Sequence, residues 1–290
     1  MMAKMLDKMR LCVALMMCVM AMSAYAQNQD DAEELRPVAK AYTIDYGYAS
    51  TLDTYLSEIR YKGYNVRLGY ERMQAMKFNP ESWVSQLDVN AQYANTKNPS
   101  GNHVMHTVMV GGRWGMMHRC RVMPKLQVMA GGSTQIGGGA LYAPANSNNV
   151  VSVKVNWSVD ATVMAIYNIK VGKLPVTLRY QAVLPVAGVM YSLDYGESYY
   201  EMYVGNHSGL VHFSSWLNRF AMTNYISADM HFGGTSVRVG YRNLIESTYV
   251  NKLNTQIYNH SLVVGLSGEW LSVRPDMKVS EKARIISAVY

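Results

Sequence analysis

The chain has 290 residues, of which 49% are hydrophobic and 16% are charged, and its formal net charge is +7. Disordered chains combine low hydrophobicity with high net charge, and collagen-like chains need far more Gly and Pro than the 22 and 8 present here. Helical membrane bundles need repeated apolar runs of about 18 residues or more. What remains is a Tyr-rich β protein with little charge. Its basic residues are dispersed along the chain, so no nucleic-acid partner is predicted.

The N-terminus has the design of a secretory signal peptide. Three basic residues precede a short apolar run at 11–22, and a small-x-small sequence ends at Ala26. This order is typical of a cleaved signal, and the run is too short for a stable membrane span. We therefore predict a signal peptide at 1–26, cleaved after Ala26, a polar leader at 27–38 and a single domain at 39–290.

Residues 151–171 show the clearest strand pattern. Every odd position in this segment is apolar or aromatic, and most even positions are polar. Such alternation indicates a strand with one apolar and one polar face. Soluble strands average about five or six residues, and a soluble β-sandwich would need two packed sheets of short strands. A span of this length is natural in a transmembrane barrel, where tilted strands cross the lipid.

The same alternation recurs in nine other segments, which lie at about 42–48, 64–71, 83–93, 104–114, 125–133, 174–182, 220–232, 236–242 and 261–270. A shorter segment at 208–217 and a tail at 278–290 would bring the total to twelve. The sequence therefore predicts an all-β fold, a transmembrane antiparallel β-barrel of about 12 strands (10–12).

The connections between these strands predict the orientation of the barrel. Long outer loops are expected at 50–58, 96–102, 136–149 and 186–206, and short turns at 77–81, 119–123, 172–174, 218–219, 233–234 and 274–276. Outer-membrane barrels have long external loops and tight periplasmic turns. We therefore expect a bacterial outer-membrane location, with outer-membrane lipid and the barrel assembly machinery as partners. The terminal aromatic residue Tyr290 fits a last strand that this machinery reads.

The inward faces of the predicted strands gather ionisable side chains of both signs, eight positive and six negative, at Asp45, Arg67, Glu71, Asp88, Arg113, Lys125, Lys154, Asp160, Lys170, Arg179, Asp229, Arg238, Arg242 and Glu269. His231 joins Asp229 as an inward pair. These residues are candidates for lining a lumen. Two alternatives are open: a hydrated channel with a slight preference for anions, and an interior filled by ion pairs. We favour a filled or partly plugged interior, and whether 186–207 occludes it is left open.

One aromatic and acidic segment is unusual for a free loop. It is Tyr195-Gly-Glu-Ser-Tyr-Tyr-Glu-Met-Tyr-Val-Gly-Asn-His-Ser-Gly209. With the signal peptide, the chain length and the aromatic terminus, it resembles an uncharacterised family of outer-membrane β-barrel proteins from Bacteroidetes, of the domain-of-unknown-function type. The resemblance implies a barrel fold and carries no activity and no catalytic residue.

The leading functional expectation is a non-enzymatic barrel that serves as a small pore, a solute route or a structural surface element. A small solute of unidentified kind is its partner candidate. The alternative is a barrel that hydrolyses or deacylates lipid, using His212 and Ser214 with Asn218 as a third polar residue. Residues at i and i+2 of a strand share a face, so an imidazole could reach a hydroxyl. Motifs for phosphate, metal or redox cofactors are absent from the sequence, so neither a cofactor nor a metal is predicted.

Overall fold

The computed structural model describes residues 34–147, 149–193, 204, 209–271 and 284–289. The predicted signal peptide and Tyr290 lie outside these residues. The described strands are β1 (Glu34–Leu35), β2 (Val38–Asp53), β3 (Ser57–Ala75), β4 (Trp83–Lys97), β5 (Val104–Met123), β6 (Leu126–Tyr142), β7 (Val151–Val171), β8 (Leu174–Tyr191), β9 (Val211–Ser215), β10 (Arg219–Phe232), β11 (Thr235–Val250), β12 (Leu253–Trp270) and β13 (Arg284–Ile285). Both β1 and the first residue of β2 fall within the segment expected to be a polar leader.

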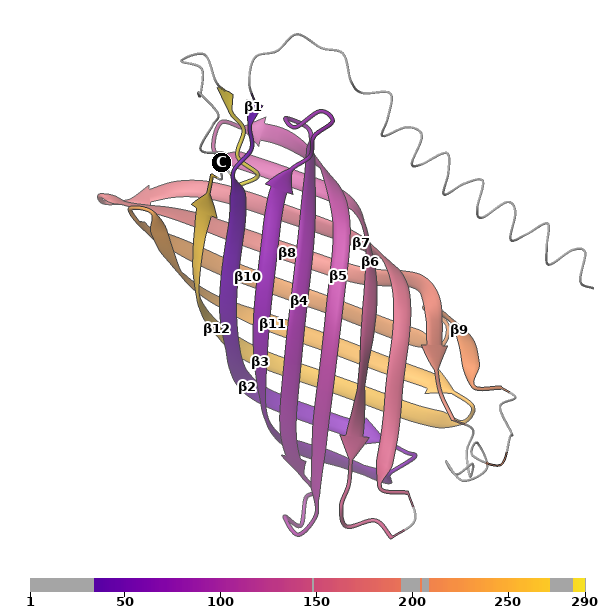
Figure 1. The fold of residues 1–290 in the computed structure, drawn as a ribbon. Helices are drawn as coiled ribbons and strands as arrows, with labels where there is room; N and C mark the ends of the chain where they lie inside the picture. The colour runs from indigo at the N-terminus through magenta and orange to yellow at the C-terminus, as the bar shows by residue number, and fades with distance from the viewer. Residues whose placement is uncertain (1–33, 148, 194–203, 205–208, 272–283, 290) are drawn as a thin grey trace, which may run out of the picture.

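Ten antiparallel strands close into a barrel (Figure 1). The order around the wall is β10-β11-β12-β2-β3-β4-β5-β6-β7-β8, and pairing of β10 with β8 closes the ring. All-β barrel architecture is confirmed, and the ten wall strands are at the lower limit of the predicted range of 10–12. The segment expected at 208–217 forms only β9, which pairs with β8 beyond the point where β10 leaves it. The described part of the tail, residues 284–289, forms only β13, which pairs in parallel with β1.

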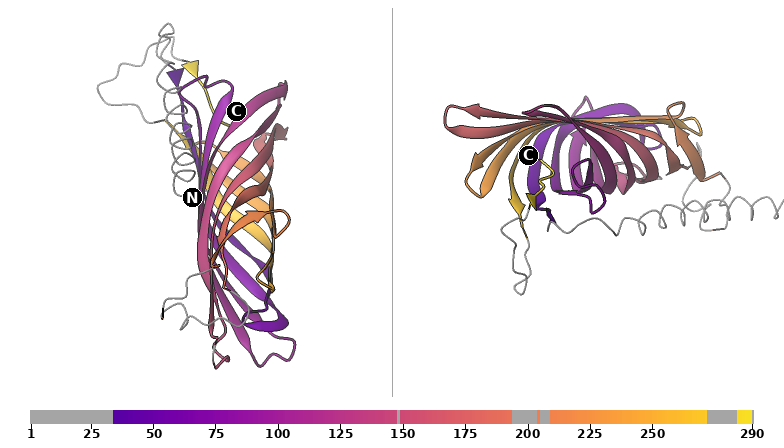
Figure 2. Two further views of the ribbon diagram at one scale, coloured as in Figure 1. Left: turned by 90° about the vertical axis from the view of Figure 1, so that its right-hand side faces the viewer. Right: turned by 90° about the horizontal axis from the view of Figure 1, so that it is seen from above.

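The two described ends of the chain lie at one end of the barrel, which we call the terminal end (Figures 1 and 2). The strands are joined there at 76–82, 124–125, 172–173 and 233–234, and at the opposite loop end at 54–56, 98–103, 143–150, 192–210 and 251–252. The long loop expected at 50–58 is wrong, because β2 continues to Asp53 and β3 begins at Ser57. The turn expected at 218–219 does not form a hairpin, since β9 and β10 both run antiparallel to β8.

The polarity of the wall is the reverse of that in a soluble protein, because apolar side chains point outward and polar side chains point inward, as β7 shows. Its outward side chains Val155, Val159 and Val163 are 46%, 47% and 47% exposed, whereas the inward Ser158 and Asp160 are 0% and 2% exposed. The other wall strands also expose large apolar side chains, including Ile44, Leu68, Val110, Ile226 and Leu262. An apolar outer band around a polar interior is the pattern of a barrel that sits in lipid. The described residues contain no apolar helix of membrane-spanning length.

The interior is packed in three layers. At the terminal end, a methionine-rich cluster holds Met73, Val84, Met117, Met129, Met164, Ile166 and Ala288. At the loop end, a second apolar cluster holds Tyr55, Leu56, Tyr61, Met105, Leu141, Ala143, Leu193, Leu210 and Leu253. Buried charged and amide side chains lie between them. The candidate functional site is this polar middle layer.

Candidate functional site

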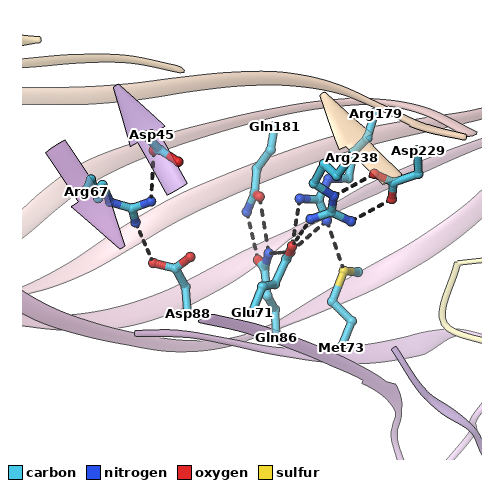
Figure 3. Close-up of polar contacts among 10 residues, drawn as sticks. All are labelled: Asp45, Arg67, Glu71, Met73, Gln86, Asp88, Arg179, Gln181, Asp229 and Arg238. Atoms are coloured by element: carbon cyan, nitrogen blue, oxygen red, sulfur yellow. Dashed lines mark hydrogen bonds and ion pairs between the residues drawn. The ribbon is translucent and has the colours of Figure 1, made fainter. Parts of the chain in front are cut away.

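Glu71 on β3 is the centre of the polar layer. It accepts two hydrogen bonds from Arg179, Nη1 to Oε1 and Nη2 to Oε2, both at 2.7 Å, and one from Arg238 Nη1 to Oε2 at 2.6 Å. Arg238 also donates from Nε and Nη2 to the two carboxylate oxygens of Asp229, both at 2.6 Å. Strands β3 and β8 are five places apart in the ring, so the Glu71–Arg179 pair spans the barrel from wall to wall (Figure 3).

An amide pair makes a second bridge across the interior. Gln181 Nε2 donates to Gln86 Oε1 at 2.7 Å, and Gln86 Nε2 donates to Glu71 Oε1 at 2.6 Å. Gln86 comes from β4 and Gln181 from β8, on facing walls (Figure 3). Buried amides and charges are tolerated only when their hydrogen bonds are satisfied. The two bridges therefore bind opposite walls together and occupy the middle of the lumen.

A second ionic group lies beside the first. Arg67 donates from Nη1 to Asp45 at 3.3 Å and from Nη2 to Asp88 at 3.1 Å. Arg242 Nε donates to the same Asp45 oxygen at 2.7 Å, and its guanidinium lies 4.0 Å from the ring centroid of Tyr225. The contact with the ring is a cation–π interaction, which is stronger in a desolvated site. Both groups thus link neighbouring and distant strands by paired charges.

The loop-end part of the polar layer holds residues that the sequence analysis missed. Asp53 Oδ2 accepts from Lys154 Nζ and from Ser152 Oγ, both at 2.9 Å. Arg219 Nε donates to Glu246 at 2.9 Å. The alternation of each strand could have found three of these residues, because Asp53, Arg219 and Glu246 occupy the next inward positions of their strands. Asp53 was assigned to a loop, and the other two stood beyond the segments recognised as strands.

The remaining lumen candidates occupy more varied positions. Asp160 accepts from Ser158 Oγ at 2.6 Å, and Glu269 accepts from Ser287 Oγ at 2.6 Å. His231 forms hydrogen bonds with Thr177 and Ser236 at its two ring nitrogens. Arg113 is half-buried and lines an interior cavity.

Two of the residues expected to face inward do not reach the interior. Lys125 is exposed in the two-residue turn after β5, and Lys170 is exposed at the end of β7. Both lie at the rim, where a long cationic side chain extends into water. Without them, the inward residues expected from the sequence comprise six positive and six negative groups. The excess of positive charge that suggested anion preference is therefore absent from this set.

The C-terminal tail closes the terminal end. Ile286 and Ala288 are 5% and 0% exposed, and Ala288 packs in the methionine-rich cluster. Arg119 donates from Nη1 to the Ser287 carbonyl at 2.6 Å and from its other nitrogens to the carbonyls of Pro80 and Glu81. The tail is thus folded into the barrel mouth rather than added to the wall as a last strand.

The structure does not assemble His212, Ser214 and Asn218 as a triad. Asn218 uses its amide on the backbone, accepting from Ser215 N at 2.9 Å and donating to the Phe213 carbonyl at 2.7 Å. His212 Nε2 lies 3.1 Å from Asn251 Nδ2. Ser214 is inside the barrel and 3% exposed. Asn218 therefore stabilises the turn between β9 and β10 and does not orient the imidazole.

The aromatic segment 195–209 and the part of 186–207 beyond β8 lie almost wholly outside the described residues. Whether this segment occludes the lumen stays a question for experiment.

Comparison with known protein families identifies the family of this chain. A model described as "Protein of unknown function (DUF3316)" matches residues 11–276. The chain belongs to the DUF3316 family. No curated protein matches this DUF3316 chain.

Several solved barrels are similar in outline. The translocator domain of the autotransporter NalP from Neisseria meningitidis is 12% identical, with 91% of this chain and 98% of that chain covered and a TM-score of 0.38. The outer-membrane protease OmpT from Escherichia coli is 8% identical, with coverages of 84% and 100% and a TM-score of 0.42. The toluene transporter TbuX from Ralstonia pickettii is 11% identical, with coverages of 82% and 90% and a TM-score of 0.27. Function must therefore be argued from the geometry of this DUF3316 chain itself.

Proposed function

We propose that this protein is a closed, non-enzymatic outer-membrane β-barrel that acts as a structural or surface element rather than as an open pore. Its N-terminal signal would direct export from a Gram-negative cell of the Bacteroidetes type, and the barrel assembly machinery would insert it. The observation that carries the proposal is the Glu71–Arg179 ion pair, which bridges opposite walls at 2.7 Å.

The proposal rests on three successive barriers along the barrel axis. The methionine-rich cluster with Ala288 blocks the terminal end, the charged bridges block the middle, and the second apolar cluster lies at the loop end. Barrels of about eight strands have interiors just wide enough for side chains to fill, whereas porins of 16–18 strands leave an aqueous channel. Ten strands, with long side chains reaching from both walls, belong with the filled class.

Outer-membrane lipid as the surrounding medium is supported by the wall. Outward valines of β7 are nearly half exposed, and Tyr46, Trp114 and Tyr167 on other outward positions are 61%, 48% and 42% exposed. A soluble protein rarely exposes an apolar surface that continues around its whole circumference. In lipid, the closed ring satisfies the backbone hydrogen bonds that water cannot reach.

Planar-bilayer recording tests the proposal. The wild-type protein, with insertion verified independently, should give a flat trace without steps of porin type. A matched variant combines Glu71→Ala, Arg179→Ala, Arg238→Ala and Gln86→Ala, which remove both bridges in the middle, with Met73→Ala, Met129→Ala and deletion of residues 284–290, which thin the methionine-rich cluster at the terminal end. This variant should conduct more than the wild-type protein, which shows that a flat wild-type trace is not failed insertion. Discrete open-channel steps from the wild-type protein would contradict the closed barrel.

A further inference from the structure

One part of the polar layer differs from the paired network around Glu71. Beside Asp88, the interior leaves a cavity of about 100 Å³, lined by Arg67, Asp88, Arg113, Gln135, Arg242 and Glu246 among others. A space of this size holds several waters or one small ion. The space exists partly because Gly111 and Gly137 line it without side chains.

The lining of this cavity has spare hydrogen-bond donors. Among the described residues, no carboxylate lies within ion-pair distance of Arg113, and the side-chain amide of Gln135 forms no hydrogen bond with another described side chain or backbone group. Arg242 uses Nε on Asp45 and its flat face on Tyr225, which leaves its two terminal nitrogens available.

The acceptors of the cavity are already engaged in part. Asp88 Oδ1 accepts from Arg67 at 3.1 Å and from Asn90 at 3.3 Å, and Glu246 Oε1 accepts from Arg219 at 2.9 Å. Guanidinium groups supply several donors in a fixed planar fork that matches the oxygens of carboxylates and phosphates. A small enclosed space with surplus guanidinium donors is suited to an oxyanion.

We propose that this cavity is a binding site for one small oxyanion, of the size of inorganic phosphate or acetate. Arg113 is its principal ligand, Arg242 is the second cation, and Gln135 supplies a neutral donor. The site is confined to the middle of the barrel, because the Glu71 bridges and the tail fill the terminal side.

A second, smaller cavity continues the site toward the loop end. It shares Asn156 and Glu246 with the first cavity and is lined further along by Lys154, Arg219 and Tyr191. Two further cations therefore lie along the direction of the outer connections. An anion entering from the loop end has one barrier to pass, the loop-end apolar cluster, whereas the terminal side has both the methionine-rich cluster and the Glu71 bridges. This inference does not depend on whether the barrel conducts.

The experiment is equilibrium dialysis of radiolabelled inorganic phosphate against the purified protein in non-ionic detergent, with a second arm using labelled acetate. We expect one saturable site per barrel, and the arm with the tighter binding identifies the tetrahedral or the planar class of oxyanion. Arg113→Gln keeps a polar amide but removes the charge and the reach of the guanidinium, and it should weaken binding at least tenfold. Arg72→Gln, on the exposed face of β3, is the matched control and should bind as wild type.

A second variant separates loss of the site from loss of folding. A Cβ on Gly137 would lie 3.5 Å from the amide of Asn156, an ordinary contact, so Gly137→Leu is tolerated near the backbone and fills the cavity. This variant should also lose anion binding, while the barrel stays folded in unheated detergent as the wild-type barrel does. Absence of saturable uptake of both anions by wild type would overturn the proposal, and so would equal binding by wild type and by folded Arg113→Gln.

Discussion

Replacing Glu71 by Gln should destabilise the barrel more than any exposed substitution of the same kind. The four hydrogen bonds that Glu71 accepts come from Arg179, Arg238 and Gln86 at 2.6–2.7 Å. An amide at this position loses the negative charge and turns one acceptor into a donor that faces other donors. Arg238 would keep Asp229, but Arg179 would lose the one carboxylate with which it pairs among the described residues.

The magnitude follows from the uncompensated Arg179 charge. Removing one partner of a buried ion pair costs about 3–5 kcal/mol, which is roughly a hundredfold or more in the unfolding equilibrium, since about 1.4 kcal/mol is a factor of ten. Glu58→Gln, on the same strand, is the matched control. Its side chain is exposed, so we expect a change within about 0.5 kcal/mol.

The assay is equilibrium urea unfolding of the barrel refolded into lipid vesicles, followed by the fluorescence of its five Trp residues. The double variant Glu71→Gln/Arg179→Gln adds an internal check. The double variant no longer contains the Arg179 charge that Glu71→Gln leaves without a partner. Its loss of stability should therefore be smaller than the sum of the losses of the two single variants. The reasoning is refuted if Glu71→Gln and Glu58→Gln unfold at the same urea concentration with the same slope.

Three further predictions concern the wall, the tail and strand packing. Val163→Arg, at a 47% exposed outward position of β7, should cost about 2–4 kcal/mol if it lies near the bilayer midplane, and vesicle unfolding that matches wild type would place this face outside lipid. Arg119→Gln removes the guanidinium that donates to the Ser287 carbonyl, and a hydrogen bond from a charged group contributes roughly 1.5–3 kcal/mol. Carboxypeptidase should therefore trim the C-terminus of this variant at least about tenfold faster. Substitution of the exposed Arg121 by Gln is the control, and equal trimming rates for the two variants would contradict the docking of the tail. Gly47→Ala places a Cβ 1.9 Å from the His260 carbonyl oxygen and should cost about 1–3 kcal/mol, whereas Gly112→Ala meets no atom within 4 Å; equal urea midpoints for the two would argue against close strand approach at Gly47.

The strands themselves could be predicted from the sequence because alternation is a local property. In each segment, apolar and polar residues alternate and so form two faces of opposite polarity. The odd or even position of a residue within its segment is enough to place Glu71, Arg179 and Arg238 inward. Parity also reaches Asp53 and Glu246 if the alternation is followed to the end of the strand. The sequence analysis stopped too early at these two positions, because polar residues near a strand end look like a loop.

The strand count and the cross-lumen partners could not be read in this way. The segments that contain β9 and β13 were counted as possible wall strands, and only pairing reveals that β9 and β10 share β8 and that β13 pairs with β1. Glu71 and Arg179 are 108 residues apart. Whether they meet depends on the number of strands and on the stagger of the ring, which together set the width and the facing positions of a barrel.

The position of two lysines changes the interpretation of the interior. With Lys125 and Lys170 counted inward, the predicted lumen had surplus positive charge, as a weakly anion-selective channel would. With both at the rim, most of the remaining charges pair across or along the wall. Pairing matters more than the net count, because an ion crossing the lumen must displace partners held in a medium of low dielectric constant, where separating charges is costly. A balanced and paired interior therefore opposes conduction of both signs. Among the cations of this set, Arg113 is the one that has no ion-pair partner within the described residues. The cavity beside it, rather than the lumen as a whole, is therefore the place where this barrel has unused capacity to bind an anion.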